Sequence, residues 1–207
     1  MSKLVINLGD GHPVSLENMI KKNGLPQKFI IANLGVGLAG PISGFLSRID
    51  ELDLGKYRLK KVITSFQNDY DAATMKSLYV PRDGNLGLGI LKRFTVVFDY
   101  PDNVIYLKPN TNFGNAFEHD MSGIEYYAAG EGLKHLIISR VEPGSAADEV
   151  GLEKDDEITS INFKPVGDMT LEEIDNLLKS KNDRNLLIEV YHDHRFDRVI
   201  LTLKRRI

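Results

Sequence analysis

Histidine side chains are the first candidates for chemistry, because imidazoles bind metals and transfer protons near neutral pH. None of the five histidines lies in the H-E-x-x-H spacing of a helical metal site: His12, His119, His135, His192 and His194. His192 and His194 would share one face of a strand and could hold a metal if a third ligand converged on them. They lie between Tyr191 and Arg195 in a stretch that reads as a hairpin turn, so a solvated turn is favoured and no metal is expected.

Nucleophile and cofactor motifs are weak. Ser43, Ser47 and Ser145 have no G-x-S-x-G turn around them, and the chain has no cysteine. Gly35 to Gly40 fits G-x-G-x-x-G, but a dinucleotide site needs a helix that begins at these glycines. Pro41 and Gly44 follow instead, which favours a glycine-rich hairpin or flap, and no cofactor is expected.

Length and composition are those of a globular protein with one large or two small domains. The chain has 207 residues, 42% of them hydrophobic and 27% charged, with a formal net charge of -3. This balance gives no electrostatic reason to expect nucleic acid or an anionic membrane as a partner. No apolar run approaches the roughly 20 residues of a membrane span, and no signal-type segment opens the chain. Leu4 to Ile6 reads as a strand entered midway, which is consistent with a piece of a longer protein.

The first half of the chain reads mainly as strands. Strands are expected at Leu4 to Ile6 and Phe29 to Ala32, and Ser15 is a candidate N-cap for a helix from Leu16 to Lys22. A polar connection from Gln67 to Arg82 could hold a helical turn around Ala72 to Leu78. Two hairpins follow from the alternation and the turn residues: Leu52 to Leu59 with its returning strand Lys61 to Phe66, and Thr95 to Tyr100 with Val104 to Pro109.

The stretch from His135 to Phe163 contains the most specific pattern. A strand is expected at Leu136 to Ile138, a short helix at Ala146 to Val150 with Ser145 as N-cap, and a strand at Glu157 to Ile161. This order resembles a PDZ domain, and nine residues are in register with the family pattern: Val141, Gly144, Ser145, Gly151, Leu152, Asp156, Ile158, Ile161 and Asn162. The departures are Ala146 for the usual proline, Val150 for alanine and Asp155 for the turn glycine.

A second resemblance covers the first half. The stretch from Gly87 to Pro109 resembles the closing half of a retropepsin-like lobe in bacterial aspartyl-protease family proteins that carry a C-terminal PDZ domain. That family has two such lobes, and the second opens with I-D-T-G-A, which here aligns with Ile6 to Asp10. The catalytic Asp of the family therefore falls on Asn7, its Thr on Leu8, and its Gly is retained as Gly9.

The departure at Asn7 argues against a free-standing peptidase. Aspartic peptidases use two carboxylates that share a proton, and an amide cannot act as a general base. Asp10 is the nearest carboxylate, but Gly11 and His12 replace the supporting Thr-Gly, so an Asp that bonds its own turn is favoured over a shifted catalytic group. The competing interpretation is that the chain is the C-terminal fragment of a bilobal aspartic endopeptidase whose catalytic Asp lies upstream or in a partner chain.

The PDZ resemblance implies where a peptide would bind. PDZ domains add a peptide as an extra strand at a sheet edge and hold its terminal carboxylate with backbone N–H groups. Met121 to Ile124 matches the carboxylate loop, Ile124 to Ala128 the edge strand, and Thr170 to Ser180 the helix opposite, with Thr170 and Glu173 as a capping box. The candidate peptide-binding residues are Ser122, Gly123, Ile124, Tyr126, Leu171, Ile174 and Leu178. The helix stripe also includes Leu177, and some of its members must face the core.

Taken together, the sequence predicts a mainly β protein with a few short helices. Residues 1–118 are expected to form a retropepsin-like β-barrel lobe including a link, and residues 119–207 a PDZ domain. Phe113 and Phe117 in the link from Asn110 to His119 are expected to pack the two domains together into a fixed tandem rather than to await a ligand. The predicted function is binding of peptide or protein C-termini, with a second lobe or a homodimer as a further partner, no nucleic acid and no membrane span. The family resemblance implies an exported, periplasmic location.

Overall fold

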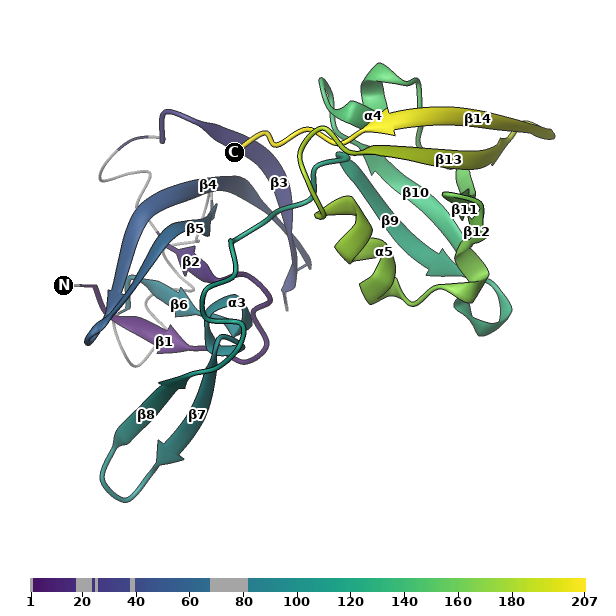
Figure 1. The fold of residues 1–207 in the computed structure, drawn as a ribbon. Helices are drawn as coiled ribbons and strands as arrows, with labels where there is room; N and C mark the ends of the chain where they lie inside the picture. The colour runs from purple at the N-terminus through teal and green to yellow at the C-terminus, as the bar shows by residue number, and fades with distance from the viewer. Residues whose placement is uncertain (1, 18–23, 25, 38–39, 68–81) are drawn as a thin grey trace. The chain divides into compact units, whose positions relative to one another are not determined.

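The computed structural model describes residues 2–17, 24, 26–37, 40–67 and 82–207. The chain divides into two compact units, residues 1–117 with Ile207 and residues 118–206. Both are built mainly from β-strands, as the sequence predicts (Figure 1). Among the described residues no helix is long and apolar enough to cross a membrane.

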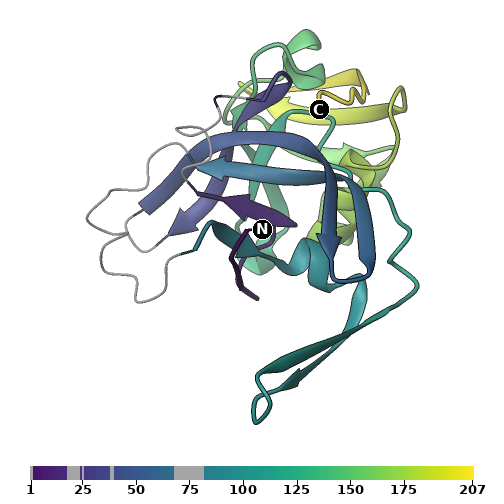
Figure 2. The ribbon, with the colours of Figure 1, turned by 90° about the vertical axis from the view of Figure 1, so that its left-hand side faces the viewer.

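The first unit is a curled six-stranded sheet with a separate hairpin (Figures 1 and 2). The sheet order is β1-β6-β2-β5-β4-β3. Its strands are β1 (Leu4–Ile6), β2 (Val14–Leu16), β3 (Phe29–Gly37), β4 (Gly40–Leu54), β5 (Tyr57–Gln67) and β6 (Gly84–Leu86). The helix α3 (Leu88–Leu91) follows β6, and β7 (Phe94–Asp99) and β8 (Val104–Pro109) form a hairpin that extends away from the sheet.

Strand β6 lies between β1 and β2, although these two strands are consecutive along the chain. It pairs parallel with β1 and antiparallel with β2. The short connection between β1 and β2 therefore passes over the end of β6, where Leu88 N–H donates to the Asp10 carbonyl and Gly87 N–H to the Pro13 carbonyl. This connection contains Asn7 to Asp10, the residues that align with D-T-G-A of the aspartic-peptidase motif.

Arg93 orders the segment that leaves the first unit. It is buried, and its guanidinium donates to the carbonyls of Gly89, Asn112 and Ala116 and stacks on the Phe117 ring at 3.6 Å. Phe117 is buried and Phe113 half-buried in the core of the first unit. Both phenylalanines therefore pack within the first unit.

The second unit is a sheet of order β14-β13-β11-β10-β9, with β12 paired to β11. Its strands are β9 (Ile124–Ala129), β10 (His135–Val141), β11 (Glu157–Ile161), β12 (Lys164–Pro165), β13 (Asn185–His192) and β14 (Arg195–Thr202). Two helices, α4 (Ala146–Glu149) and α5 (Leu171–Leu178), and the short 3-10 turns η1 (Glu131–Leu133) and η2 (Val166–Asp168) complete it. Seventeen buried residues, among them Ile138, Ile158 and Leu186, form one core.

Most predicted elements are confirmed, with one error. Ser145 caps α4 by accepting from Asp148 N–H, Gly151 ends it with φ of 73°, and Thr170 forms both halves of the capping box with Glu173. The glycine-rich stretch forms a hairpin, since Gly37 pairs with Gly40 across β3 and β4. Ser15 is not a helix cap, because it is a buried β2 residue whose hydroxyl donates to Asp10.

Three predictions involve residues outside those described. Most of the helix expected from Leu16 to Lys22 falls there, as does the helical turn around Ala72 to Leu78. Within Gly35 to Gly40, residues 38 and 39 fall there as well.

Candidate functional site

The strand β9 forms one of the two edges of the second unit's sheet. β9 pairs antiparallel with β10 on one side and stands at the end of the strand order. α5 lies beside it (Figure 1), and the Tyr126 hydroxyl of β9 donates to the Asp175 carboxylate of α5 at 2.7 Å. Burial, followed by this hydrogen bond to a carboxylate, raises the pKa of Tyr126 well above its usual range. The strand edge and the helix are therefore joined by a neutral tyrosine.

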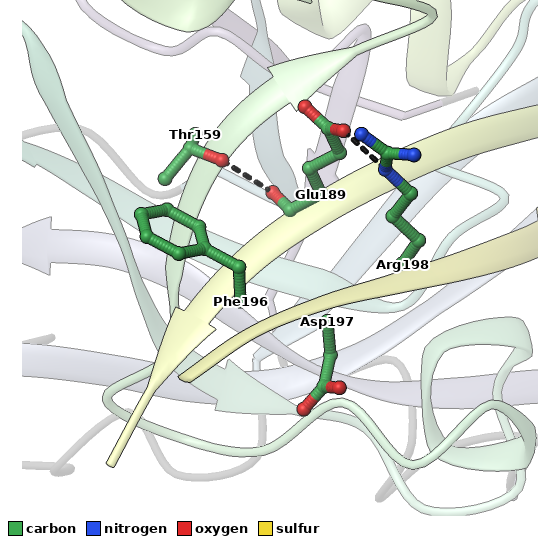
Figure 3. Close-up of a pocket in the computed structure, with 5 residues that line it drawn as sticks. All are labelled: Thr159, Glu189, Phe196, Asp197 and Arg198. Atoms are coloured by element: carbon green, nitrogen blue, oxygen red, sulfur yellow. Dashed lines mark hydrogen bonds and ion pairs between the residues drawn. The ribbon is translucent and has the colours of Figure 1, made fainter. Parts of the chain in front are cut away.

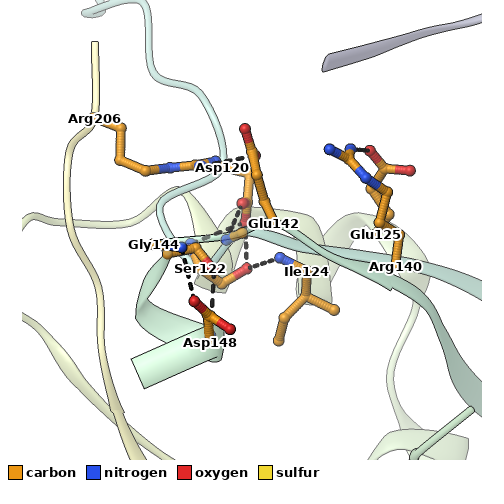
Figure 4. Close-up of polar contacts among 11 residues, drawn as sticks. Asp120, Ser122, Ile124, Glu125, Arg140, Glu142, Gly144, Asp148 and Arg206 are labelled. Atoms are coloured by element: carbon orange, nitrogen blue, oxygen red, sulfur yellow. Dashed lines mark hydrogen bonds and ion pairs between the residues drawn. The ribbon is translucent and has the colours of Figure 1, made fainter. Parts of the chain in front are cut away.

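The loop before β9 is held from within by Asp120 (Figure 4). One Asp120 carboxylate oxygen accepts from Gly123 N–H at 2.6 Å, and the other from Ser122 N–H at 3.2 Å and from the Ser122 hydroxyl at 2.6 Å. The Ser122 hydroxyl oxygen accepts from Ile124 N–H at 3.1 Å. The three successive N–H groups of Ser122, Gly123 and Ile124 are thus all hydrogen-bonded inside the loop.

The loop is also fixed from behind. Ala147 N–H donates to the Ser122 carbonyl and Glu142 N–H to the Gly123 carbonyl, each at 2.9 Å. Gly123 has φ of 81°, and a Cβ at this position would lie 2.1 Å from the Ser145 Cβ. The sequence therefore requires glycine here for two reasons, a left-handed backbone and the close approach of the α4 cap.

Charges around the loop are paired or buried. Arg206 Nη1 lies 2.7 Å from a Glu142 carboxylate oxygen, and both side chains are largely buried. Burial raises the pKa of Asp120, while the hydrogen bonds from Ser122 and Gly123 and the charge of Arg206 act in the opposite direction. Asp120 is consequently a carboxylate whose ionised form depends on the loop N–H groups.

The candidate peptide-binding residues differ in how deeply they are buried. Ser122, Gly123 and Ile124 are buried, and Tyr126 is half-buried against the core. On α5, Ile174 and Leu178 belong to the core with 1% and 3% of their surface exposed, whereas Leu171 is 49% exposed. Only the first turn of the helix thus offers an exposed apolar side chain from the predicted set.

The aspartic-peptidase position is a tight turn. The Asn7 side-chain oxygen accepts from Gly9 N–H at 3.0 Å. Asp10 accepts from His12 N–H at 2.9 Å and from the Ser15 hydroxyl at 2.5 Å, and Ser15 accepts from the buried Ser65 hydroxyl at 2.7 Å. Burial raises the pKa of Asp10, but the hydrogen bonds from His12 and Ser15 outweigh it and the pKa is lowered. Asp10 acts here as an acceptor for its own turn.

His192 and a surface hollow lie on strands of the second unit other than β9. His192 Nδ1 contacts the Asp156 carboxylate, and Asp193 and His194 form the turn between β13 and β14. No group of three or more potential metal ligands occurs in the described part of the chain. The hollow in Figure 3 is lined by Thr159, Glu189, Phe196, Asp197 and Arg198, on β11, β13 and β14 rather than on β9.

Asp120 is the site residue that the sequence analysis missed. Asp commonly accepts from N–H groups two or three residues onward, so an Asp before a Ser-Gly pair was the available signal. The spacing alone could not show that these N–H groups are the ones implied for a ligand's carboxylate.

Comparison with known proteins identifies the second unit. Residues 137–191 match the family model of the PDZ domain, so the chain contains a PDZ domain. The matched residues run from β10 to β13 and exclude β9 and the loop that precedes it. No curated protein matches the chain.

Similar solved structures include proteases and PDZ domains. The photosystem II D1 C-terminal processing protease shares 20% identity over 47% of this chain and 26% of its own, with a TM-score of 0.40. The HtrA3 PDZ domain bound to a phage-derived ligand shares 18% identity over 42% of this chain and 86% of its own, with a TM-score of 0.34. The serine endoprotease from Yersinia pestis shares 11% identity over 97% of this chain and 66% of its own, with a TM-score of 0.40. The chain thus spans about a quarter of the first protein, and these likenesses assign no fold to the first unit.

Proposed function

We propose that the PDZ domain binds the C-terminal segment of a peptide or protein along the free edge of β9. The observation that supports this is the combination of an unpaired strand edge, a capped helix beside it, and a loop of three successive N–H groups at its start. An extended peptide at this edge would hydrogen-bond to β9 as an antiparallel strand, with its terminus toward the loop.

In this proposal, side-chain contacts come from the exposed turn of α5. Leu171 would contact an apolar ligand side chain, while Ile174 and Leu178 support the helix from the core. Tyr126 and Ile124 would lie beneath the ligand, with the Tyr126 to Asp175 hydrogen bond fixing the distance between strand and helix. Peptide specificity would then depend mainly on the first turn of α5.

A screen of synthetic peptides against the whole chain tests this proposal. Binders would be titrated by calorimetry against the chain and against Leu171→Glu, which places a charge on the exposed helix turn. Ile200→Glu is the matched control, because Ile200 is 63% exposed on β14 at the far edge of the same sheet. We expect Leu171→Glu to weaken binding at least about tenfold and Ile200→Glu to leave it unchanged. Equal effects, or no binder, would contradict the proposal.

A second proposal concerns the first unit, as a retropepsin-like lobe of a bilobal aspartic endopeptidase. The supporting observation is the insertion of β6 between β1 and β2, which places Asn7 in a turn over the end of β6. The second carboxylate would come from upstream sequence or from another copy of the chain. By the same resemblance, we propose an exported, cell-envelope location.

The peptidase proposal is tested by restoring the missing carboxylate. Asn7→Asp would be assayed with an unfolded protein substrate at acidic pH, beside the unchanged chain and Asn7→Ala, with size-exclusion chromatography to follow dimers. Cleavage by Asn7→Asp alone, in a dimeric fraction, is the expected result for a paired lobe. Absence of cleavage from a dimeric Asn7→Asp would contradict pairing between copies of this chain.

A further inference from the structure

The Asp120 carboxylate occupies the position in which the proposed function places a ligand's terminal carboxylate. Its two oxygens accept from Ser122 N–H and Gly123 N–H, and the third N–H of the loop, that of Ile124, is bonded to the Ser122 hydroxyl. No N–H of this three-residue set is left without an acceptor in the structure. A ligand carboxylate can therefore gain the hydrogen bonds from Ser122 N–H and Gly123 N–H only where Asp120 gives them up.

We propose that Asp120 is a built-in competitor that masks the loop, so that free C-termini are captured only when the Asp120 carboxylate leaves it. This inference rests on the proposed function, since it concerns the same strand edge and loop. In the masked state, a peptide is held by pairing with β9 and by its side chains, and its terminal carboxylate adds little to the affinity.

Proximity makes the competition effective. Asp120 is two and three residues from the N–H groups that it binds, so its effective concentration at the loop far exceeds that of a dissolved ligand. A carboxylate that displaced it would form the hydrogen bonds that Asp120 loses, with no net gain in their number. Two carboxylates would also share the neighbourhood of Arg206, whose guanidinium is already paired with Glu142.

The rest of the loop does not need Asp120 to keep its position. The carbonyls of Ser122 and Gly123 accept from Ala147 and Glu142, Met121 N–H donates to the Leu178 carbonyl, and Lys204 N–H donates to the Met121 carbonyl. Removal of the Asp120 carboxylate should therefore free the N–H groups of Ser122 and Gly123 rather than unfold the loop.

Paired ligands test the inference. The tightest peptides from the screen would be made as free acids and as C-terminal amides, and the ratio of their affinities measured for the whole chain, Asp120→Ala and Asp120→Asn. We expect a ratio near one for the unchanged chain and at least about tenfold in favour of the free acid for Asp120→Ala, because a loop filled nine-tenths of the time loses tenfold in affinity. Asp120→Asn keeps one acceptor oxygen and should give an intermediate ratio.

Asp148→Ala is the matched control. The Asp148 carboxylate also accepts from a backbone N–H of this domain, that of Gly144 at 2.8 Å, but it contacts none of the three loop N–H groups (Figure 4). The ratio of free-acid to amide affinity should be the same in Asp148→Ala as in the unchanged chain. The inference would be overturned if the unchanged chain already bound the free acid tenfold more tightly than the amide. It would also be overturned if the ratio of the two affinities stayed the same in both Asp120 variants. Neither outcome would contradict peptide binding itself.

Acetate provides a probe that needs no peptide ligand. Titration with sodium acetate, against sodium chloride at equal ionic strength, would be followed through the amide resonances of Ser122, Gly123 and Ile124. We expect saturable shifts of these three signals in Asp120→Ala and none in the unchanged chain. If no peptide binds but acetate behaves in this way, the proposed function fails and the masking of the loop stands; equal acetate shifts in both proteins overturn the masking.

Discussion

At the scale of single residues, a comparison of Gly123 with Gly144 distinguishes two reasons for a glycine: a left-handed backbone, and a neighbour that leaves no space for a Cβ atom. Both have left-handed backbones, with φ of 81° and 70°, but only at Gly123 would a Cβ meet a neighbour, Ser145, within 4 Å. We expect Gly123→Ala to lower the free energy of unfolding of the second unit by about 3 kcal/mol or more, and Gly144→Ala by about 1 kcal/mol. Urea unfolding followed by circular dichroism measures both. Similar losses would show that the contact with Ser145 does not constrain the loop.

Asp10 is expected to stabilise the first unit rather than to act in catalysis. Asp10→Ala removes the acceptor for the His12 N–H and the buried Ser15 hydroxyl, at a cost of about 1–3 kcal/mol. Asp99→Ala is the control, because the Asp99 carboxylate accepts from Asp102 N–H in an exposed turn. Urea titrations of the three proteins measure the difference, and equal losses would contradict the role given to the buried Ser15.

The lowered pKa of Asp10 also fixes the sign of its pH dependence. A carboxyl group with a lower pKa in the folded state binds fewer protons there than in the unfolded chain. Its stabilising contribution is therefore complete above the unfolded pKa, near 4, and disappears as the pH falls through the lower folded value. The difference in stability between Asp10→Ala and the unchanged chain should shrink on acidification. A difference that grows would contradict this assignment.

At the scale of elements, α5 depends on its N-terminal cap. The Thr170 hydroxyl accepts from Glu173 N–H at 3.1 Å, and Glu173 accepts from Thr170 N–H at 2.7 Å. Thr170→Ala should lower the unfolding free energy by about 1 kcal/mol and weaken peptide binding, because Leu171 lies in the turn that loses its cap. Thr170→Ser should retain both properties. A loss of peptide binding in Thr170→Ser would mean that the methyl group, and not the cap, matters.

At the scale of the whole molecule, two separate cores predict two separable unfolding steps. Ile138 is fully buried in the core of the second unit and Val62 in that of the first. Ile138→Ala should lower the stability of the second unit by about 2–5 kcal/mol, and Val62→Ala should lower that of the first unit, each without shifting the other step. Calorimetry with both variants tests this. A single transition displaced equally by either variant would contradict independent folding.

Local sequence determined most elements of the second unit and the hairpins of the first. Ser145 and Thr170 act on N–H groups three residues away, and the turn at Pro101 to Asn103 joins adjacent strands, so the necessary partners are close along the chain. The same local reasoning failed at Ser15. Its partner Ser65 is 50 residues distant, and its burial between β5 and β6 depends on a strand pairing that no local pattern states.

Only the tertiary structure decided which hydrogen-bonding groups already have a partner and which side chains are exposed. The sequence placed Ser122 to Ile124 at the start of an edge strand, but not the direction of the Asp120 carboxylate, which depends on how the loop folds back on itself. It grouped Leu171, Ile174 and Leu178 on one helix, but the depth of each depends on the sheet packed beneath. Residue types and spacing set local backbone geometry, whereas exposure and the filling of hydrogen-bonding groups follow from contacts between segments distant in the chain.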